Sequence, residues 1–275
     1  MRSPTNFAQR LAGAWDVQGS MLCVGLDPDL RRLPAAVLRE PDPIFAFLRA
    51  IVDATAPWCA AFKPQIAYFA AIGAERSLER LLAHIEARHP AHLRLLDAKR
   101  GDIGDTAVMY AREAFERYGA DAVTVSPYLG PEGFAPFAED PARGCFLLCR
   151  TSNPDSDVMQ LHGEPPLYQR VAALAAGEWN RNGNLGLVAG ATQPTALAEI
   201  RDLAGSLPLL VPGVGAQGGD VEAAVRAGRD SRGRGMLINS SRAILYASAG
   251  DDFASAAAAV ARQTHQSIQA AAGAQ

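Results

Sequence analysis

A dense group of opposite charges follows the apolar run at residues 93–96. It contains Asp97, Lys99 and Asp102, with one residue between Asp97 and Lys99 and two residues between Lys99 and Asp102. Side chains alternate between the two faces of a strand, so Asp97 and Lys99 should share a face, while Asp102 should lie on the loop beyond. A carboxylate and an ammonium on one face can serve catalysis. They can equally form a surface salt bridge, worth about 0 to 1 kcal/mol.

Length and composition limit the possible folds. The chain has 275 residues and is 49% hydrophobic, enough for a substantial core in one large or two small domains. A (β/α)8 barrel typically needs about 250 residues. The net charge of −3, with scattered basic residues, gives no broad field for nucleic acid. With neither a signal-like apolar segment nor a membrane-spanning stretch, we expect a cytoplasmic protein with no nucleic-acid or membrane partner.

The cysteines and histidines indicate no metal site or disulfide framework. The four cysteines lack a CxxC spacing and sit inside apolar runs, and the five histidines are dispersed along the sequence. We therefore expect the cysteines to be small buried hydrophobic residues. We expect no metal ligands.

Short apolar runs alternate with longer stretches of helical periodicity. The expected strands are residues 22–26, 60–63, 93–97, 122–125, 145–149, 185–189, 209–211 and 236–239. The expected helices are residues 43–56, 77–88, 107–117, 133–138, 166–180, 195–204, 219–227 and 252–272. Eight strands alternating with helices favour a parallel sheet that closes into a barrel. The sequence thus predicts a single α/β domain over residues 1–275, a (β/α)8 TIM barrel.

The carboxyl ends of these strands are unusually polar. Such barrels carry their active sites there, in the loops that follow the strands. The polar groups fall at Asp27 and Asp29 after the first strand, at Lys63 and Gln65 after the second, and at residues 97–106, 150–154, 212–220 and 239–242 after later ones.

The segments after the seventh and eighth strands suggest a phosphate site. Glycines within residues 213–219 let backbone amides approach a ligand, and the helix expected next favours an anion at its N-terminus. Arg242 can bind phosphate oxygens with two parallel hydrogen bonds. The same glycines also fit a simple tight turn, so the motif alone leaves both interpretations open.

Three segments together resemble the orotidine 5′-phosphate decarboxylase family. They are Asp97-Ala98-Lys99-Arg100-Gly101-Asp102-Ile103 with Thr106, then Pro212-Gly213-Val214-Gly215-Ala216-Gln217, then Ser240-Ser241-Arg242. The resemblance spans roughly residues 24–246, nearly the whole predicted barrel. The Lys-Arg-Gly context and the chain length resemble the longer-chain subgroup that includes mycobacterial enzymes.

The resemblance implies decarboxylation of orotidine 5′-monophosphate to UMP and CO2, the last step of UMP synthesis, without a cofactor. It makes Lys63, Asp97, Lys99 and Asp102 an alternating charge network. It also places Asp102 and Thr106 in the active site of a partner subunit, so that the enzyme is a homodimer with shared sites. For the substrate, it implies that Asp27 and Lys63 bind ribose hydroxyls, Ser152 or a neighbour contacts the pyrimidine, and Gln217 and Arg242 hold the 5′-phosphate.

The chemistry of the residues agrees with this assignment. Loss of CO2 from a ring carbon leaves electron density that needs a fixed cation and then a proton, and Lys99 can supply both. An ammonium held between Asp97 and Asp102 should stay charged. Two alternatives remain: a sister sugar-phosphate decarboxylase or epimerase on the same barrel, which would normally need a metal, and a non-catalytic nucleotide-binding protein.

Overall fold

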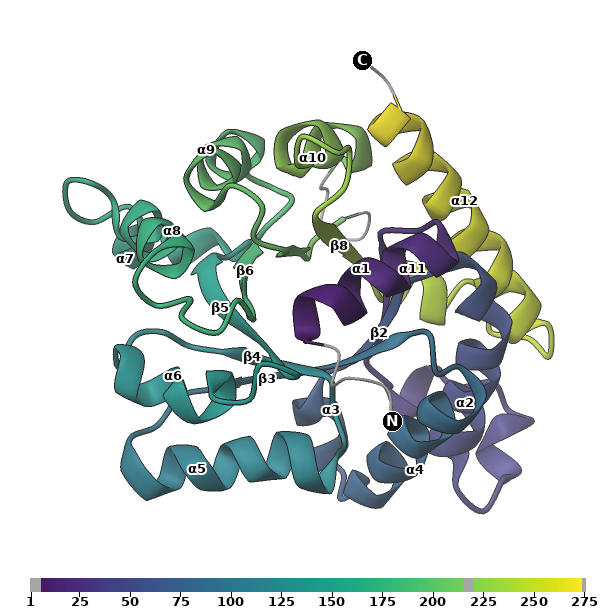
Figure 1. Cartoon of the computed structure of the whole chain (residues 1–275). Coiled ribbons are helices and arrows are strands. Elements are labelled where there is room, and N and C mark those ends of the chain that lie inside the picture. Colours follow the sequence, from purple (N-terminus) through teal and green to yellow (C-terminus); the bar gives the residue numbers. More distant parts are fainter. Residues whose placement is uncertain (1–5, 215–219, 274–275) are drawn as a thin grey trace.

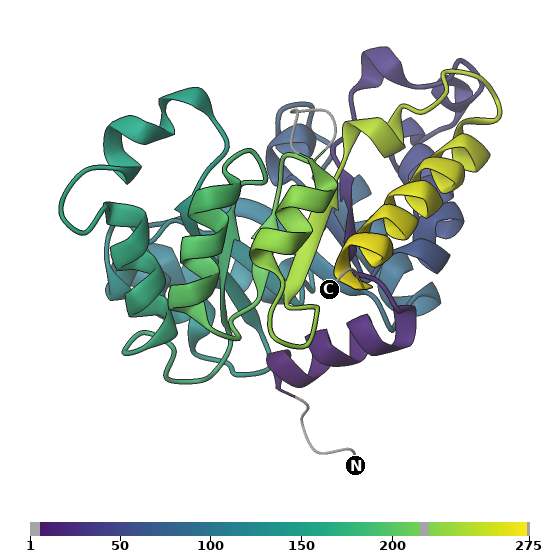
Figure 2. The same cartoon turned by 90° about the horizontal axis from the view of Figure 1, so that it is seen from above.

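Eight parallel strands form a closed barrel surrounded by helices (Figures 1 and 2). The computed structural model describes residues 6–214 and 220–273. The strands are β1 (Leu22–Leu26), β2 (Ala61–Pro64), β3 (Leu93–Arg100), β4 (Ala122–Val125), β5 (Gly144–Arg150), β6 (Leu185–Ala189), β7 (Leu209–Val211) and β8 (Met236–Ser240). Each strand pairs with the next, and β8 pairs with β1. The predicted TIM barrel is confirmed.

The helices lie outside the barrel and across one of its ends. They are α1 (Phe7–Gln18), α2 (Pro43–Thr55), α3 (Ile66–Ala70), α4 (Glu75–Arg88), α5 (Gly104–Arg112), α6 (Pro131–Ala138), α7 (Asp157–Gln160), α8 (Leu167–Ala176), α9 (Pro194–Ala204), α10 (Val221–Gly228), α11 (Arg242–Leu245) and α12 (Phe253–Gly273). Short 3-10 turns occur at Leu30–Arg32, Val37–Arg39, Ala56–Trp58 and Pro154–Ser156. A π-helical turn, Glu113–Arg117, extends α5.

The eight predicted strands match the observed ones to within three residues, whereas several helix ends differ. The helix expected over 166–180 ends at Ala176, and the helix expected from residue 107 already begins at Gly104. The N-terminal helix α1 was not predicted. It begins at a capping box, in which the Asn6 side chain accepts from the Gln9 amide and the Gln9 side chain accepts from the Asn6 amide.

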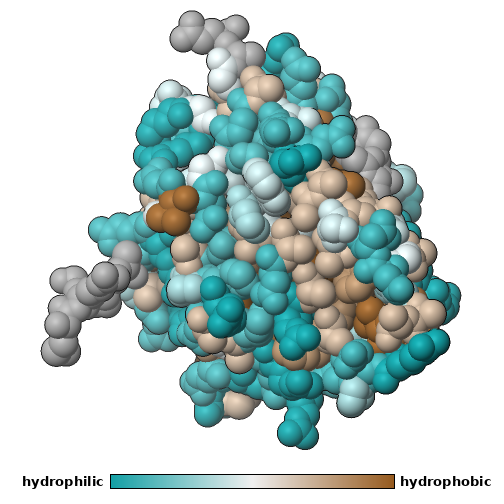
Figure 3. Space-filling model, turned by 90° about the vertical axis from the view of Figure 1, so that its right-hand side faces the viewer, coloured by the Kyte–Doolittle hydropathy of each residue, from teal (hydrophilic) through white to brown (hydrophobic). Residues whose placement is uncertain are grey.

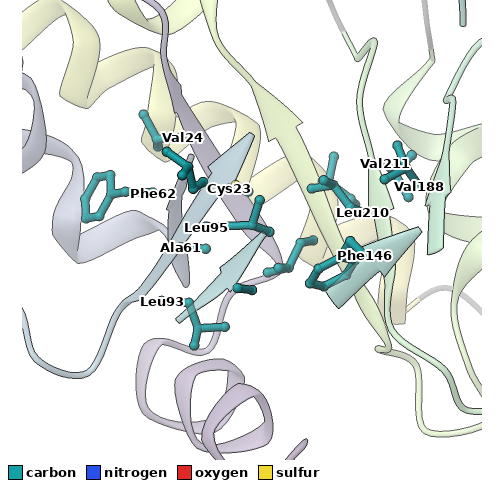
Figure 4. Packing of buried hydrophobic residues seen from close by; sticks show 14 of the residues in the cluster. Cys23, Val24, Ala61, Phe62, Leu93, Leu95, Phe146, Val188, Leu210 and Val211 are labelled. Atoms are coloured by element: carbon teal, nitrogen blue, oxygen red, sulfur yellow. The ribbon is translucent and has the colours of Figure 1, made fainter. Parts of the chain in front are cut away.

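Helix α1 closes the amino-terminal end of the barrel (Figure 1). The Phe7 ring is buried edge-to-face against Phe146 of β5, with the ring centroids 6.0 Å apart. Two glycines make room for these rings: a Cβ on Gly144 would lie 2.4 Å from Phe7, and a Cβ on Gly186 would lie 2.5 Å from Phe146. Figure 4 shows this core, where side chains such as Leu95, Phe146 and Leu210 from different strands meet. Apolar packing therefore fills this end and leaves the opposite end for polar groups.

The four cysteines, Cys23, Cys59, Cys145 and Cys149, are buried free thiols, as expected. Burial raises the pKa of the Cys149 thiol to about 12 and that of Cys23 likewise to about 12, so both stay protonated and unreactive.

The outer surface is mainly hydrophilic on the side that carries α12 and α2. Figure 3 shows this side with a pale brown area bordered by hydrophilic side chains and only small spots of high hydropathy. Within residues 6–214 and 220–273, no helix combines the length and apolar character needed to cross a bilayer.

We predict that Phe7→Ala strongly destabilises the protein, because it removes the ring that fills the closed end of the barrel. The free energy of unfolding, measured by urea denaturation, should fall by about 3–5 kcal/mol. The matched control is Val17→Ala on the same helix, whose side chain is 70% exposed and which should change stability by about 0.5 kcal/mol or less. Equal effects of the two substitutions would show that α1 does not plug the barrel.

Candidate active site

One carboxylate joins two lysines at the carboxyl ends of β2 and β3. Lys63 Nζ lies 2.8 Å from Asp97 Oδ2, and Lys99 Nζ lies 2.7 Å from Asp97 Oδ1. The side chains of Lys63 and Asp97 are only 4% and 11% exposed, whereas that of Lys99 is 46% exposed. Lys63 is thus a buried counter-ion, while Lys99 presents its ammonium group to the mouth of the barrel.

Thr124 of β4 is a third partner of this carboxylate, which the sequence analysis missed. Its hydroxyl donates to Asp97 Oδ1 at 2.8 Å and accepts from the backbone amides of Ala98 and Lys99, both at 3.0 Å. The signal in the sequence was a polar residue within an otherwise apolar strand. Thr124 therefore orients both the carboxylate and the backbone that carries Lys99.

The backbone of β3 is irregular where it carries Lys99. Its register against β4 shifts between Leu96 and Arg100, and Lys99 has a φ of 48°. Among the residues that the structure describes, Lys99 is the one non-glycine with a positive φ. For an L-residue this left-handed conformation costs about 1–2 kcal/mol. Simple strand alternation, used in the sequence analysis, is therefore wrong as the reason for the pairing: the irregular backbone between Leu96 and Arg100 brings Lys99 to Asp97.

Charge pairing outweighs burial at both buried groups. Burial alone would raise the pKa of Asp97, but Lys63 and Lys99 together hold it well below its usual range. Burial would likewise lower the pKa of Lys63, but Asp97 and then Asp27 raise it above its ordinary value. Both groups therefore remain charged at neutral pH.

Asp27 lies just beyond β1, near enough to Lys63 to raise the pKa of that lysine. Its loop is held by Tyr246, whose hydroxyl donates to the Asp27 carbonyl oxygen at 3.1 Å and accepts from the Asp29 amide at 2.6 Å. The Asp27 Oδ1 atom is buried and has no hydrogen-bond partner among the described residues. This oxygen can therefore accept from a hydroxyl group of a ligand.

The ends of β1 and β8 approach each other closely beside Asp27. A Cβ on Gly25 would lie 1.7 Å from Ser241 Oγ, so this approach requires glycine. Asn239 is buried, and its amide nitrogen lies 3.2 Å from Ser241 Oγ. Its Oδ1 atom is another buried acceptor without a partner in the described part of the chain. Sequence analysis had placed Asn239 at a polar strand end without a role.

The loop after β5 is anchored by Arg150. Its buried guanidinium donates to Ser156 Oγ at 2.5 Å and to Gln160 Oε1 at 3.2 Å, and it also pairs with Asp157. Ser152 lies in this loop against the end of β6, since a Cβ on Gly190 would be 3.0 Å from the Ser152 Cβ. The arrangement fixes Ser152 at the same end of the barrel as the charged cluster.

No hydrogen bond or ion pair in the described part of the chain joins Asp102, Thr106 or Arg242 to Asp97. Asp102 accepts from the Ile103 amide at 2.9 Å, and none of the ion pairs in the described ranges joins it to Lys99. Thr106 is exposed in the first turn of α5, and Arg242 is exposed at the start of α11. Gln217 lies outside the described residues. Within one chain, then, the structure brings together Lys63, Asp97 and Lys99, but not Asp102.

The fold and the site together define a class: a (β/α)8-barrel enzyme with a Lys-Asp-Lys cluster at the carboxyl ends of its strands. Residues 20–259 match the model of the orotidine 5′-phosphate decarboxylase / HUMPS family, and the chain belongs to this family.

Individual relatives support the same family assignment. The chain is 57% identical over 267 residues to the orotidine 5′-phosphate decarboxylase of Azoarcus sp. (strain BH72), covering 96% of this chain and 99% of that protein. It is similar to the OMP decarboxylase structure from Leishmania donovani, with a TM-score of 0.83, 38% identity and coverage of 98% and 100%. The UMP synthase structure from that organism gives a TM-score of 0.87 and 39% identity, covering 98% of this chain and 57% of that chain.

We predict that Asp97→Asn destabilises the protein in a pH-dependent way. At pH 7 it leaves the Lys63 ammonium buried without its partner, which should cost about 3–5 kcal/mol of unfolding free energy. The pKa of Asp97 is lower in the folded protein than its unfolded value of 3.8, so the stability from ionised Asp97 is present above about pH 4 and lost as the pH falls further.

The difference in unfolding free energy between wild type and Asp97→Asn, measured in urea from pH 7 to pH 3, should therefore shrink below about pH 4. The control is Asp251→Asn, a change at an exposed carboxylate. A difference that stays constant across this range would refute the assigned ionisation of Asp97.

Proposed function

We propose that this chain catalyses the decarboxylation of orotidine 5′-monophosphate to UMP and CO2, with Lys99 as the central catalytic residue. The main support for this proposal is the Lys63–Asp97–Lys99 cluster at the mouth of the barrel, found in a member of the orotidine 5′-phosphate decarboxylase / HUMPS family. Curated relatives of 54–57% identity are named as this decarboxylase.

The reaction needs a fixed cation and a proton at one ring carbon. The bond from that carbon to the carboxylate breaks, its electron pair stays on the carbon, and CO2 leaves. The Lys99 ammonium stabilises the resulting carbanion and donates a proton to it. The neutral amine then regains a proton from water. Asp97, fixed by Lys63 and Thr124, holds the ammonium in place before the reaction begins.

Remote parts of the substrate would bind at the neighbouring strand ends. We assign the ribose hydroxyls to Asp27, whose Oδ1 is a buried acceptor, and to Lys63. Ser152 would contact the pyrimidine, and Gln217 and Arg242 would hold the 5′-phosphate. Binding energy from the phosphate can then position the ring at Lys99.

The proposed chemistry requires no cofactor, because Lys99 supplies both the positive charge and the proton. A sister sugar-phosphate decarboxylase or epimerase would instead use a metal ion at this end of the barrel. A nucleotide-binding protein without activity would have no use for a buried Lys63–Asp97 pair, which is costly to keep.

We also propose that the active enzyme is a homodimer in which Asp102 and Thr106 complete the partner's site. Among the described residues, no hydrogen bond or ion pair joins either of them to the charged cluster of its own chain. Exposed apolar side chains follow them on the loop after β3 and on α5, and others lie on the loop after β4, close to Gly133 of α6, which approaches Asp102. These are Ile103, Val108, Met109, Tyr128 and Leu129. Neighbouring exposed apolar residues of this kind fit an interface with a second copy of the chain.

The proposed location is the cytoplasm. Substrate and product are phosphorylated nucleotides, whose charge prevents them from crossing lipid.

The direct test is the ultraviolet absorbance of orotidine 5′-monophosphate with purified, metal-free protein. We predict that wild type removes the orotate chromophore and that Lys99→Ala reduces the rate at least about 1,000-fold, because it deletes both the cation and the proton donor. UMP binding by Lys99→Ala, measured by calorimetry, controls for folding. UMP binding by wild type without any loss of absorbance would identify a nucleotide-binding protein instead, and activity that requires added metal would favour the sister enzyme.

The shared site predicts subunit complementation. Lys99→Ala and Asp102→Ala should each be nearly inactive alone. After mixing and exchange of subunits, half of the dimers are mixed and each has one intact site, so about a quarter of wild-type activity should return. Mixing Lys99→Ala with Asp97→Ala is the control. Each chain supplies both Asp97 and Lys99 to one site, so each site of this mixed dimer lacks one of the two residues. Absence of recovery in a verified mixed dimer would refute the shared site.

A further inference from the structure

A cluster of residues that commonly bind metal ions lies outside the barrel, between α2 and α4. Asp53 of α2 faces two histidines, His84 and His89, and both Nε2 atoms contact the same carboxylate oxygen. His84 Nε2 lies 2.7 Å and His89 Nε2 lies 2.8 Å from Asp53 Oδ1. The three ligand atoms lie within 4.8 Å of one another. The catalytic assignment uses none of them.

The end of α4 explains how the two histidines converge. Residues five apart on a regular helix point about 140° away from each other. However, α4 ends at Arg88, and His89 is its C-cap, with φ −133° and ψ 53°. Its amide still donates to the Ile85 carbonyl oxygen at 2.8 Å. The change in backbone direction turns the His89 ring back toward His84, which sequence spacing could not show.

Neighbouring rings hold both imidazoles in place while leaving the carboxylate accessible. Phe45 packs edge-on against His84, and Phe62 and His92 lie against His89. The side chains of His84 and His89 are 16% and 19% exposed, whereas that of Asp53 is 47% exposed. The cluster is thus preorganised on its protein side and open on its solvent side.

We propose that Asp53, His84 and His89 form a binding site for one divalent transition-metal ion of the Zn²⁺ type. Two imidazoles and a carboxylate suit Zn²⁺, whereas Mg²⁺ prefers oxygen ligands. Bonds of about 2.0–2.1 Å in a tetrahedral site need ligand atoms about 3.3 Å apart. The two distances to Asp53 Oδ1, 2.7 and 2.8 Å, come within about 0.6 Å of that value, and the two Nε2 atoms lie no more than 4.8 Å apart. Rotations of the three side chains can therefore bring the ligand atoms to the required spacing. Water would supply the fourth ligand from the open side.

The two rings can change from hydrogen-bond donors to metal ligands. A carboxylate only accepts hydrogen bonds, so in the metal-free cluster each ring donates from Nε2 to Asp53. When the ion binds, each Nε2 gives up its proton, which leaves to solvent while Nδ1 carries the remaining N–H, and the Nε2 lone pair becomes the ligand. The ion then links α2 to the end of α4 more firmly than the two hydrogen bonds that it replaces.

This site is separate from the proposed reaction. Asp53, His84 and His89 lie on helices outside the barrel, while Lys63, Asp97 and Lys99 lie at the ends of its strands. Binding should therefore raise thermal stability without being needed for activity.

The test is titration of the full-length, metal-stripped protein with Zn²⁺ by calorimetry, with Mg²⁺ as the contrasting ion. We expect one saturable Zn²⁺ site of micromolar or tighter affinity, and none for Mg²⁺. His84→Gln, His89→Gln and Asp53→Asn should each weaken binding at least about tenfold. The matched control is His162→Gln, at an exposed histidine in the loop after α7.

Two further readouts keep the test decisive. At a Zn²⁺ concentration about a hundredfold above Kd, Tm should rise by about 3 °C or more in wild type and His162→Gln, but not in Asp53→Asn, which preserves the side-chain shape. Bound Co²⁺ should give a visible spectrum that His84→Gln abolishes. Absence of saturable Zn²⁺ binding in wild type, or equal affinity in His84→Gln and His162→Gln, would overturn the proposal.

Discussion

The shared Asp97 carboxylate is the constraint on which the active end of this molecule depends. Removing a carboxylate from water costs several kcal/mol unless cations and hydrogen bonds replace the lost solvation. Asp97 therefore requires Lys63, Lys99 and Thr124 together, and these come from β2, β3 and β4. A parallel register brings the carboxyl ends of those strands to one side. The charge network at Asp97 therefore depends on the parallel barrel, which brings its partners together.

The two ends of the barrel differ in composition: one is packed with apolar side chains and the other carries the polar groups. At the amino-terminal end, α1 covers the strands and Phe7 packs onto Phe146, so the interior there is apolar and tightly filled. At the carboxyl end, acceptor atoms of Asp27 and Asn239 that have no hydrogen-bond partner within residues 6–214 and 220–273 lie beside charged groups. The polar end is where the left-handed backbone at Lys99 directs its ammonium group to the barrel mouth.

The cluster of Asp53, His84 and His89 depends on the packing of two outer helices rather than on the strand ends. Asp53 and His84 are brought together because α2 and α4 pack side by side against the barrel. A bound ion would strengthen that packing, while the strand ends that carry Lys63 and Lys99 would keep their geometry. On this proposal, a metal ion would affect stability and the substrate would meet the catalytic groups, at separate sites of the same chain.

Local patterns of the sequence predicted the eight strands and the closed α/β architecture, because apolar periodicity reports each element separately. They also indicated that Asp97 and Lys99 lie together, but the reason is the irregular backbone of β3, which strand alternation does not describe. The sequence did not reveal α1, whose role depends on the barrel end that it covers, or Thr124, whose hydroxyl matters only beside Asp97. It also left His84 and His89 dispersed, since a change of backbone direction at the end of α4 joins them. Such contacts join segments that are distant in the sequence. Tertiary packing decides them, because the register between strands and the backbone direction at helix ends bring the side chains together, and neither follows from residue spacing along the chain.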